Sequence, residues 1–173
     1  MKRIVTSAIA LGLFVAGIGV GFASQHVTRS MYHTVTPQEA AANLLDVAKE
    51  EAEGGSWEMI GIGRVLYLGG QKDKAEAIFS EVLGDDPEDS DSYRIAHVYA
   101  EAGEWAKAKP MFDRYVERNK KEYRDLVEIG ALYMLNGDRE TAERLYDIAF
   151  QSRWEFWSIV YAAGSYLGVK PQQ

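Results

Sequence analysis

The sequence predicts an all-α fold, a solenoid of antiparallel helix pairs, and three observations lead to this prediction. Three alanines recur at intervals of 33 and 34 residues, and each is followed four positions later by an aromatic residue, in the pairs Ala75 and Phe79, Ala108 and Phe112, and Ala142 and Tyr146. A glycine precedes each pair, at Gly70, Gly103 and Gly137. A small residue lies further upstream in each repeat, at Gly63, Ala96 and Gly130. Periods of this size are typical of solenoids, in which each helix pair packs on the next.

Each of about three repeats is expected to contain two helices, A and B. Helix A is predicted at 56–68, 90–102 and 123–136, and helix B at 72–84, 105–118 and 139–151. The glycine between A and B supplies a left-handed residue that can reverse the chain. The repeats are therefore expected to occupy 56–88, 89–122 and 123–156.

Two further helices are expected to cap the ends of the stack. Thr36 followed by Pro37, with Glu39 in the first turn, is a helix start signal and predicts an N-terminal capping helix over 36–53. A C-terminal capping helix is predicted over 157–168, followed by a tail at 169–173. Its packing positions, Val160, Ala163, Gly164 and Leu167, lie 34 residues after Leu126, Ile129, Gly130 and Tyr133. We expect this helix to cover the end of repeat three.

The small-x-x-aromatic pattern followed by Ala-x-x-x-aromatic resembles the tetratricopeptide repeat. The resemblance implies a right-handed superhelix that presents a binding surface, not one particular chemistry. One departure is Lys120, which stands where repeat one has Pro87, and it bears on the angle between repeats two and three.

The resemblance also implies which residues line the concave groove, since helix A faces it with its second, fifth, ninth and twelfth positions. Transferred residue by residue, these positions are Trp57, Ile60, Arg64, Tyr67, Tyr93, His97, Val127, Ala131, Met134, Tyr161 and Ser165. Such aromatic, apolar and arginine side chains are enriched where proteins bind each other. The alternative is that the N-terminal helix or linker fills the groove and that these residues are core.

The first 23 residues have the order of a secretory signal. Lys2 and Arg3 precede an uncharged run over 4–23 that ends in small residues, which predicts cleavage after Ala23. The alternative is an uncleaved anchor in the inner membrane formed by 4–23. Both interpretations place the folded part beyond the membrane, because positive charge stays inside. With no cysteine to accept a lipid, we expect a bacterial periplasmic protein.

Residues 24–35 are interpreted as a linker. Its two histidines, His26 and His33, could bind a metal, but no third ligand lies at suitable spacing, so a polar tether is favoured. A second candidate cation site is the acidic cluster Asp85, Asp86, Glu88, Asp89 and Asp91. It lacks the glycine and terminal glutamate of a calcium loop. Asp89 or Ser90 is instead expected to cap helix A of repeat two.

Charge and motifs argue against several functions. The net charge of −7 disfavours nucleic acid and anionic membrane surfaces as partners. The absence of cysteine excludes disulfides and thiol nucleophiles. The sequence has no phosphate-binding loop, nucleophile elbow or His-x-x-x-His pair, and His97 is the only histidine in the predicted repeats. We therefore expect neither an enzyme nor a cofactor.

The expected function is a non-enzymatic binding or assembly module of the cell envelope. The concave groove would hold an extended segment or helix of another envelope protein. The alternative is a structural subunit that self-associates through the C-terminal helix, where Ile159, Ala162 and Tyr166 form a second apolar stripe. The tail at 169–173 could instead cover part of this stripe.

Overall fold

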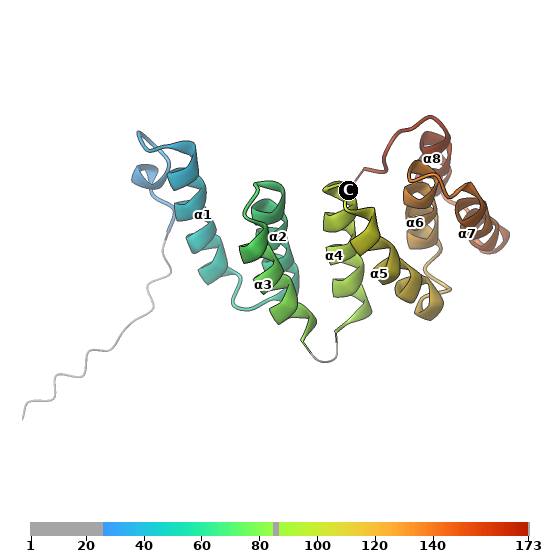
Figure 1. The fold of residues 1–173 in the computed structure, drawn as a ribbon, viewed down its shortest axis with the longest axis horizontal. Helices are drawn as coiled ribbons and strands as arrows, with labels where there is room; N and C mark the ends of the chain where they lie inside the picture. Colours follow the sequence, from blue (N-terminus) through green and yellow to red (C-terminus); the bar gives the residue numbers. More distant parts are fainter. Residues whose placement is uncertain (1–25, 85–86, 173) are drawn as a thin grey trace, which may run out of the picture.

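The computed structural model describes residues 26–84 and 87–172, and within these ranges all regular secondary structure is helical (Figure 1). The elements are the 3-10 helix η1 (Arg29–Met31) and the α-helices α1 (Pro37–Glu51), α2 (Ser56–Leu68), α3 (Lys72–Leu83), α4 (Asp89–Glu101), α5 (Trp105–Arg118), α6 (Tyr123–Leu135), α7 (Arg139–Ser152) and α8 (Phe156–Tyr166). The pairs α2/α3, α4/α5 and α6/α7 follow one another, with α1 at one end and α8 at the other. The fold is a helical repeat solenoid, as the sequence predicts.

The helix termini follow the local signals in the sequence. All α-helices begin and end within two residues of their predicted bounds. At α1, the Thr36 side chain accepts a hydrogen bond from the Glu39 amide at 3.2 Å, and the Glu39 carboxylate accepts one from the Thr36 amide at 2.9 Å. This reciprocal pair is a capping box. The reversals between paired helices use Gly70, Gly103 and Gly137, whose φ angles are +86°, +78° and +87°.

The predicted cap of α4 is wrong. Asp89 lies inside the first turn, and its carboxylate accepts hydrogen bonds from Arg118 at 3.0 Å and Asn119 at 3.1 Å. Asp91 is buried and accepts a hydrogen bond from Ser56 at 2.9 Å. These carboxylates thus tie α4 to the end of α5 and the start of α2. Residues 85–86 of the acidic cluster lie outside the described residues.

In the first and third pairs the two helices cross where helix A has a glycine, and in the second pair this position is Ala96. Ala75, Ala108 and Ala142 are completely buried at these crossings. A methyl group added at Gly63 would lie 2.3 Å from a ring carbon of Phe79, and one at Gly130 would lie 2.7 Å from a ring carbon of Tyr146. The aromatic ring of helix B therefore fills the space that a side chain on helix A would need.

Repeats two and three are joined differently from the others. The backbones of α2 and α4 pack closely, as do those of α6 and α8, whereas α4 and α6 are held apart by side chains. Tyr115 donates a hydrogen bond to Asp125 at 2.5 Å, and the ring of Trp105 meets that of Tyr133 edge-on, with the centroids 4.9 Å apart. The wider spacing occurs at the junction where the sequence departs from the repeat pattern.

Helix α8 packs on α6 through an unexpected face. The buried residues of α8 are Ser158, Tyr161, Ala162 and Ser165. The four predicted packing positions lie elsewhere: Val160, Ala163 and Leu167 are exposed and Gly164 is half-buried. The expectation that these four residues cover repeat three is therefore wrong.

The N-terminal part of the chain is described only from residue 26. The segment interpreted as a signal or anchor lies outside the described residues. None of the helices that the structure does describe is both long and apolar enough to cross a membrane. The described part of the predicted linker contains η1, and Asn43 of α1 donates a hydrogen bond to the Met31 carbonyl at 2.9 Å.

The crossing geometry predicts that Gly130→Ala destabilises the fold. The new methyl group would meet the buried Tyr146 ring and, at 3.2 Å, the Ala142 backbone carbonyl, which cannot move aside. Overpacking of this kind costs about 1–3 kcal/mol, and because the backbone carbonyl is fixed we expect a cost above the roughly 1 kcal/mol that alanine gains over glycine in a helix. Urea unfolding should therefore show a lower unfolding free energy for the variant.

The matched control is Gly61→Ala, also in the middle of a helix A. A methyl group at Gly61 meets nothing within 4 Å, so this variant should be neutral or slightly more stable. Equal effects of the two substitutions would contradict the crossing model.

Candidate functional site

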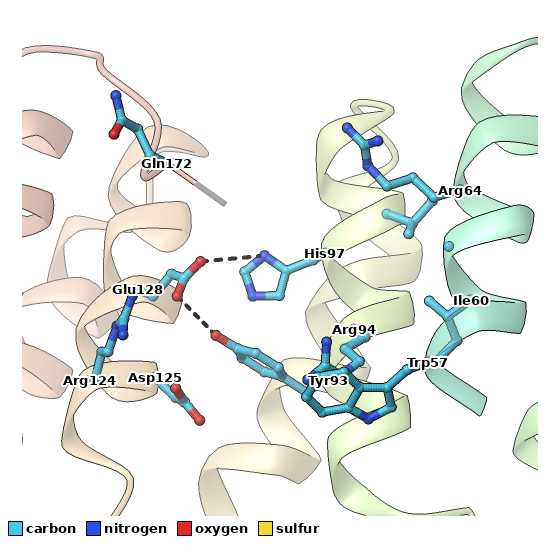
Figure 2. A pocket seen from close by; sticks show the side chains of 12 residues that line it. Trp57, Ile60, Arg64, Tyr93, Arg94, His97, Arg124, Asp125, Glu128 and Gln172 are labelled. Atoms are coloured by element: carbon cyan, nitrogen blue, oxygen red, sulfur yellow. Dashed lines mark hydrogen bonds and ion pairs between the residues drawn. The ribbon is translucent and has the colours of Figure 1, made fainter. Parts of the chain in front are cut away.

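A groove runs along the face of the solenoid formed by α2, α4 and α6 (Figure 2). Its main cavity has a volume of about 480 Å³ and is lined by Trp57, Ile60, Gly61, Arg64, Tyr93, Arg94, His97, Val98, Arg124, Asp125, Glu128 and Gln172. An adjoining cavity of about 250 Å³ is lined by Arg64, His97, Ala100, Glu101, Glu128, Leu132, Lys170 and Pro171. The two cavities share three residues, and together they span the widened junction between repeats two and three.

One wall of the groove is formed by Trp57, whose ring stacks on the guanidinium of Arg94. Trp57 lies in the first turn of α2 and is 58% exposed. The guanidinium carbon of Arg94, on α4, lies 3.1 Å from the centre of the Trp57 ring (Figure 2). Such stacking orients an aromatic side chain and adds cation–π attraction. Ile60 lies one turn along α2 and is buried. The wall therefore offers a fixed apolar surface with a cation behind it.

The floor is a largely buried polar cluster that bridges α4 and α6. Tyr93 donates a hydrogen bond to one Glu128 oxygen at 3.2 Å, and His97 Nδ1 lies 3.9 Å from the other oxygen (Figure 2). Burial, with the Arg94 charge, lowers the pKa of His97 to about 4. Burial raises the pKa of Glu128 above its ordinary value. His97 is therefore neutral at pH 7, and its contact with Glu128 is not an ion pair.

Two arginines of the groove, Arg64 and Arg124, each form an ion pair with a glutamate outside their own helix. Arg64 of α2 binds both oxygens of Glu101 on α4, with Nε to Oε2 at 2.7 Å. The Nε atom of Arg124, on α6, lies 4.0 Å from Glu155. Because both ion pairs are largely exposed, each contributes little free energy, and a ligand carboxylate could replace the glutamate as the partner of the arginine at little cost in free energy. Both arginines can therefore turn toward a carboxylate or carbonyl of a ligand.

The C-terminal tail of the chain lies in this groove. After α8 the chain turns back across α6 toward α4 (Figure 1). Lys170 and Pro171 line the smaller cavity and Gln172 lines the larger one. The Tyr161 hydroxyl donates a hydrogen bond to the backbone carbonyl of Gln172 at 3.0 Å. The predicted residue Tyr161 thus contacts an extended peptide, namely that of its own chain.

The structure brings five of the eleven predicted groove residues together. Trp57, Ile60, Arg64, Tyr93 and His97 all line the main cavity. Of the others, Tyr67, Val127, Ala131, Tyr161 and Ser165 are buried, and Met134 packs partly buried against the core. These residues contribute to helix packing and do not line an open wall.

The burial of these predicted groove residues has two physical causes. Tyr67 packs in the α2/α3/α4 core, and its hydroxyl donates to Glu104 at 2.6 Å and accepts from Lys107 at 2.9 Å. In repeat three, α8 packs along α6, and the fifth and ninth positions, Val127 and Ala131, are completely buried. The groove side of α6 is therefore formed by its second, third and sixth positions.

Several groove residues were not predicted. Four of them lie on the first helix of a repeat: Arg94, Arg124, Asp125 and Glu128. The repeat register assigns only the position of Arg124, the second of its helix, to the groove. The second-position rule applied to repeat three could have found Arg124. Nothing in the repeat pattern signals the tail residue Gln172.

The self-association stripe predicted on α8 does not form one exposed face. Ile159 is exposed, but Ala162 is buried. Tyr166 is half exposed, and its hydroxyl donates a hydrogen bond to Glu143 of α7 at 3.0 Å. The tail does not cover this stripe, since it turns into the groove.

The predicted histidine pair of the linker is described in the structure. His33 Nε2 lies 2.9 Å from the Arg29 guanidinium, and His26 is exposed. Among the residues that the structure describes, no group of three or more His, Cys, Asp or Glu side chains could hold a metal ion.

The lowered pKa of His97 predicts a pH-dependent stability. A histidine of pKa 6.5 in the unfolded chain and about 4 in the fold stabilises the fold fully above pH 6.5, and this contribution falls as the pH drops toward 4. Glu128, whose pKa is raised, acts in the opposite direction. Because His97→Gln keeps Glu128, comparison with the wild type isolates the histidine.

Urea unfolding at pH 7 and pH 4 measures this difference. Between pH 7 and pH 4 the unfolding free energy of the wild type should fall by about 3 kcal/mol more than that of His97→Gln. Parallel losses in the two proteins would mean that His97 is not held neutral by burial.

Comparison with known proteins gives one match. Residues 59–89, which run from α2 through α3 to the start of α4, match the family model of the tetratricopeptide repeat. No curated protein and no solved structure matches the chain. Tetratricopeptide repeats generally mediate protein–protein interaction and are generally non-enzymatic. The match covers the first helix pair of the solenoid, and the two helix pairs that follow it have the same register.

Proposed function

We propose that the protein is a non-enzymatic binding module of the bacterial cell envelope that holds an extended segment of another envelope protein in the groove formed by α2, α4 and α6. The chain would be exported and would work in the periplasm, either released after Ala23 or anchored through residues 4–23. The order of charge and apolar residues at the N-terminus supports export.

N-terminal sequencing of the protein from the envelope fraction should begin at Ser24; full-length protein in the cytoplasm would contradict export.

The tail inside the groove is the observation that supports peptide binding most directly. Residues 170–172 line the same two cavities as helix A side chains from all three repeats, and the Tyr161 hydroxyl donates a hydrogen bond to the Gln172 backbone carbonyl. Hydrogen bonds to the main chain suit any extended peptide, whatever its sequence. The groove therefore already has the shape and donors that an extended ligand requires.

The side chains along the groove indicate the chemistry of the ligand. Trp57 presents an exposed ring that an apolar or aromatic side chain could cover. Arg64 and Arg124 lie nearby and could pair with a carboxylate. The proposed ligand is thus an extended segment with an apolar anchor and at least one acidic residue. Since the tail occupies the same groove, such a ligand must displace residues 170–172.

This proposal predicts opposite effects of two changes in the groove. Trp57→Ala removes the exposed anchor surface and should weaken partner binding at least roughly 10-fold, since central aromatic contacts often contribute more than 1 kcal/mol. Deletion of residues 170–173 removes an intramolecular competitor and should strengthen binding several-fold. A partner captured from the envelope fraction and then purified would be titrated against each variant by calorimetry.

The matched control is Tyr32→Ala, which truncates a half-exposed aromatic residue outside the groove and should leave the affinity unchanged. All three variants should melt within a few degrees of the wild type, because Trp57 and Tyr32 are more than half exposed and the deleted residues lie after the last helix. Unchanged affinity of Trp57→Ala would remove the groove as the binding site. Unchanged affinity of the deletion variant would show that the tail does not compete.

A further inference from the structure

Helix α8 continues the register of the first helices of the three repeats, and the described residues that follow it form no second helix. In the register of α6, the residues Val160, Ala163, Gly164 and Leu167 correspond to Leu126, Ile129, Gly130 and Tyr133. In α6 these positions are covered by α7, and all four are buried. The chain after α8 turns away into the groove, so that no helix of the described chain covers the equivalent side of α8.

The uncovered side of α8 is exposed at positions that are buried in α6. Val160 is 40% exposed and Leu167 is 81% exposed. A methyl group at Gly130 would collide with Tyr146, whereas one at Gly164 would meet only Val169, at 3.5 Å or more. The recess that receives an aromatic ring in repeats one and three is therefore present in α8 without an occupant from helix B.

This side of α8 is also unusually apolar. The open face, as we name it, consists of Phe156, Trp157, Val160, Ala163, Gly164 and Leu167, and it lies opposite the buried residues of the helix. Helix α8 buries two serines while it exposes Phe156 to 69% and Trp157 to 48%. The sequence has no charged residue from Phe156 to Val169. A terminal repeat that meets water normally has a polar outer face, so this helix is built to be covered.

We propose that a second copy of this chain covers the open face, with the two α8 helices packed antiparallel about a two-fold axis. In every helix pair of the solenoid, A and B are antiparallel, and a two-fold axis across α8 produces the same arrangement. The open face also contains both halves of the A–B contact. Gly164 supplies the recess of helix A, and Ala163 with Leu167 repeats the spacing of Ala142 and Tyr146 in helix B.

Charge and size both favour a second copy over another occupant. Since the open face has no charged residue, pairing two copies buries no unpaired charge despite the net charge of −7 on each chain. A stable dimer buries about 800 Å² on each partner, and aromatic side chains contribute roughly 150–250 Å² each when fully covered. Phe156, Trp157 and the nearby Trp154, which is 72% exposed, can supply much of that area together with Val160 and Leu167.

The first test is the mass of the purified protein in solution, measured by sedimentation equilibrium. The wild type should have twice the mass of its chain at micromolar concentrations. Leu167→Glu places a charge in the interface and should raise the dimer dissociation constant roughly 30-fold or more. The matched control is Val65→Glu on α2, where an apolar residue of 49% exposure lies outside the open face, and it should remain a dimer.

A second test locates the contact independently of stability. The chain has no cysteine, so Ala163→Cys gives a single thiol at the centre of the open face. A short thiol-reactive cross-linker should join two copies of this variant, and it should not join copies of Lys49→Cys on α1. A wild type that stays monomeric at tens of micromolar would overturn the proposal. A dimer that survives Leu167→Glu and leaves Ala163→Cys unlinked would overturn it as well. Because groove binding is measured separately, neither result bears on the proposed partner site.

Discussion

The structure depends on the close crossing between the two helices of each repeat. At Gly63 and Gly130 the aromatic ring of helix B lies where a side chain of helix A would be, and the alanine of helix B is completely buried. This contact fixes the angle within a pair, and the repetition of the pair produces the solenoid and its inner face. The same constraint explains the end of the chain. Helix α8 retains the glycine of the crossing, at Gly164, but the described residues after it form no second helix, and its apolar side remains exposed.

The repeated contact creates two surfaces with different chemistry at different places on the solenoid. The groove is mixed in character, with Trp57 and Ile60 beside the buried cluster of Tyr93, His97 and Glu128. It suits an extended peptide, as the position of the tail illustrates. The open face of α8 is uncharged and suits a helix. If both surfaces work as proposed, a dimer would present two grooves, and a partner with two binding segments would gain avidity.

The sequence predicted the helices closely because their signals are local: a capping box at Thr36 and Glu39, and left-handed glycines at the reversals. The groove was predicted less well, because it depends on the angle between repeats. Where α2 and α4 pack closely, Trp57 and His97 line the main cavity, as the register predicts, whereas Tyr67 is buried. Where α8 packs on α6 and the backbones of α4 and α6 separate, the inner face rotates, and Glu128 takes the place expected for Val127. Long-range packing of this kind leaves no short sequence signal.

Site-specific photo-crosslinking in living cells would test the central claim, that this solenoid binds its partner through the groove. A photoreactive amino acid would replace Trp57, which lies in the groove, or Lys109, a residue of α5 that does not line the groove and whose side chain is 44% exposed. The account predicts that the Trp57 position links to one defined segment of an envelope protein, and that this link increases when residues 170–173 are deleted. Links that form only from Lys109, or equally from both positions, would contradict the claim.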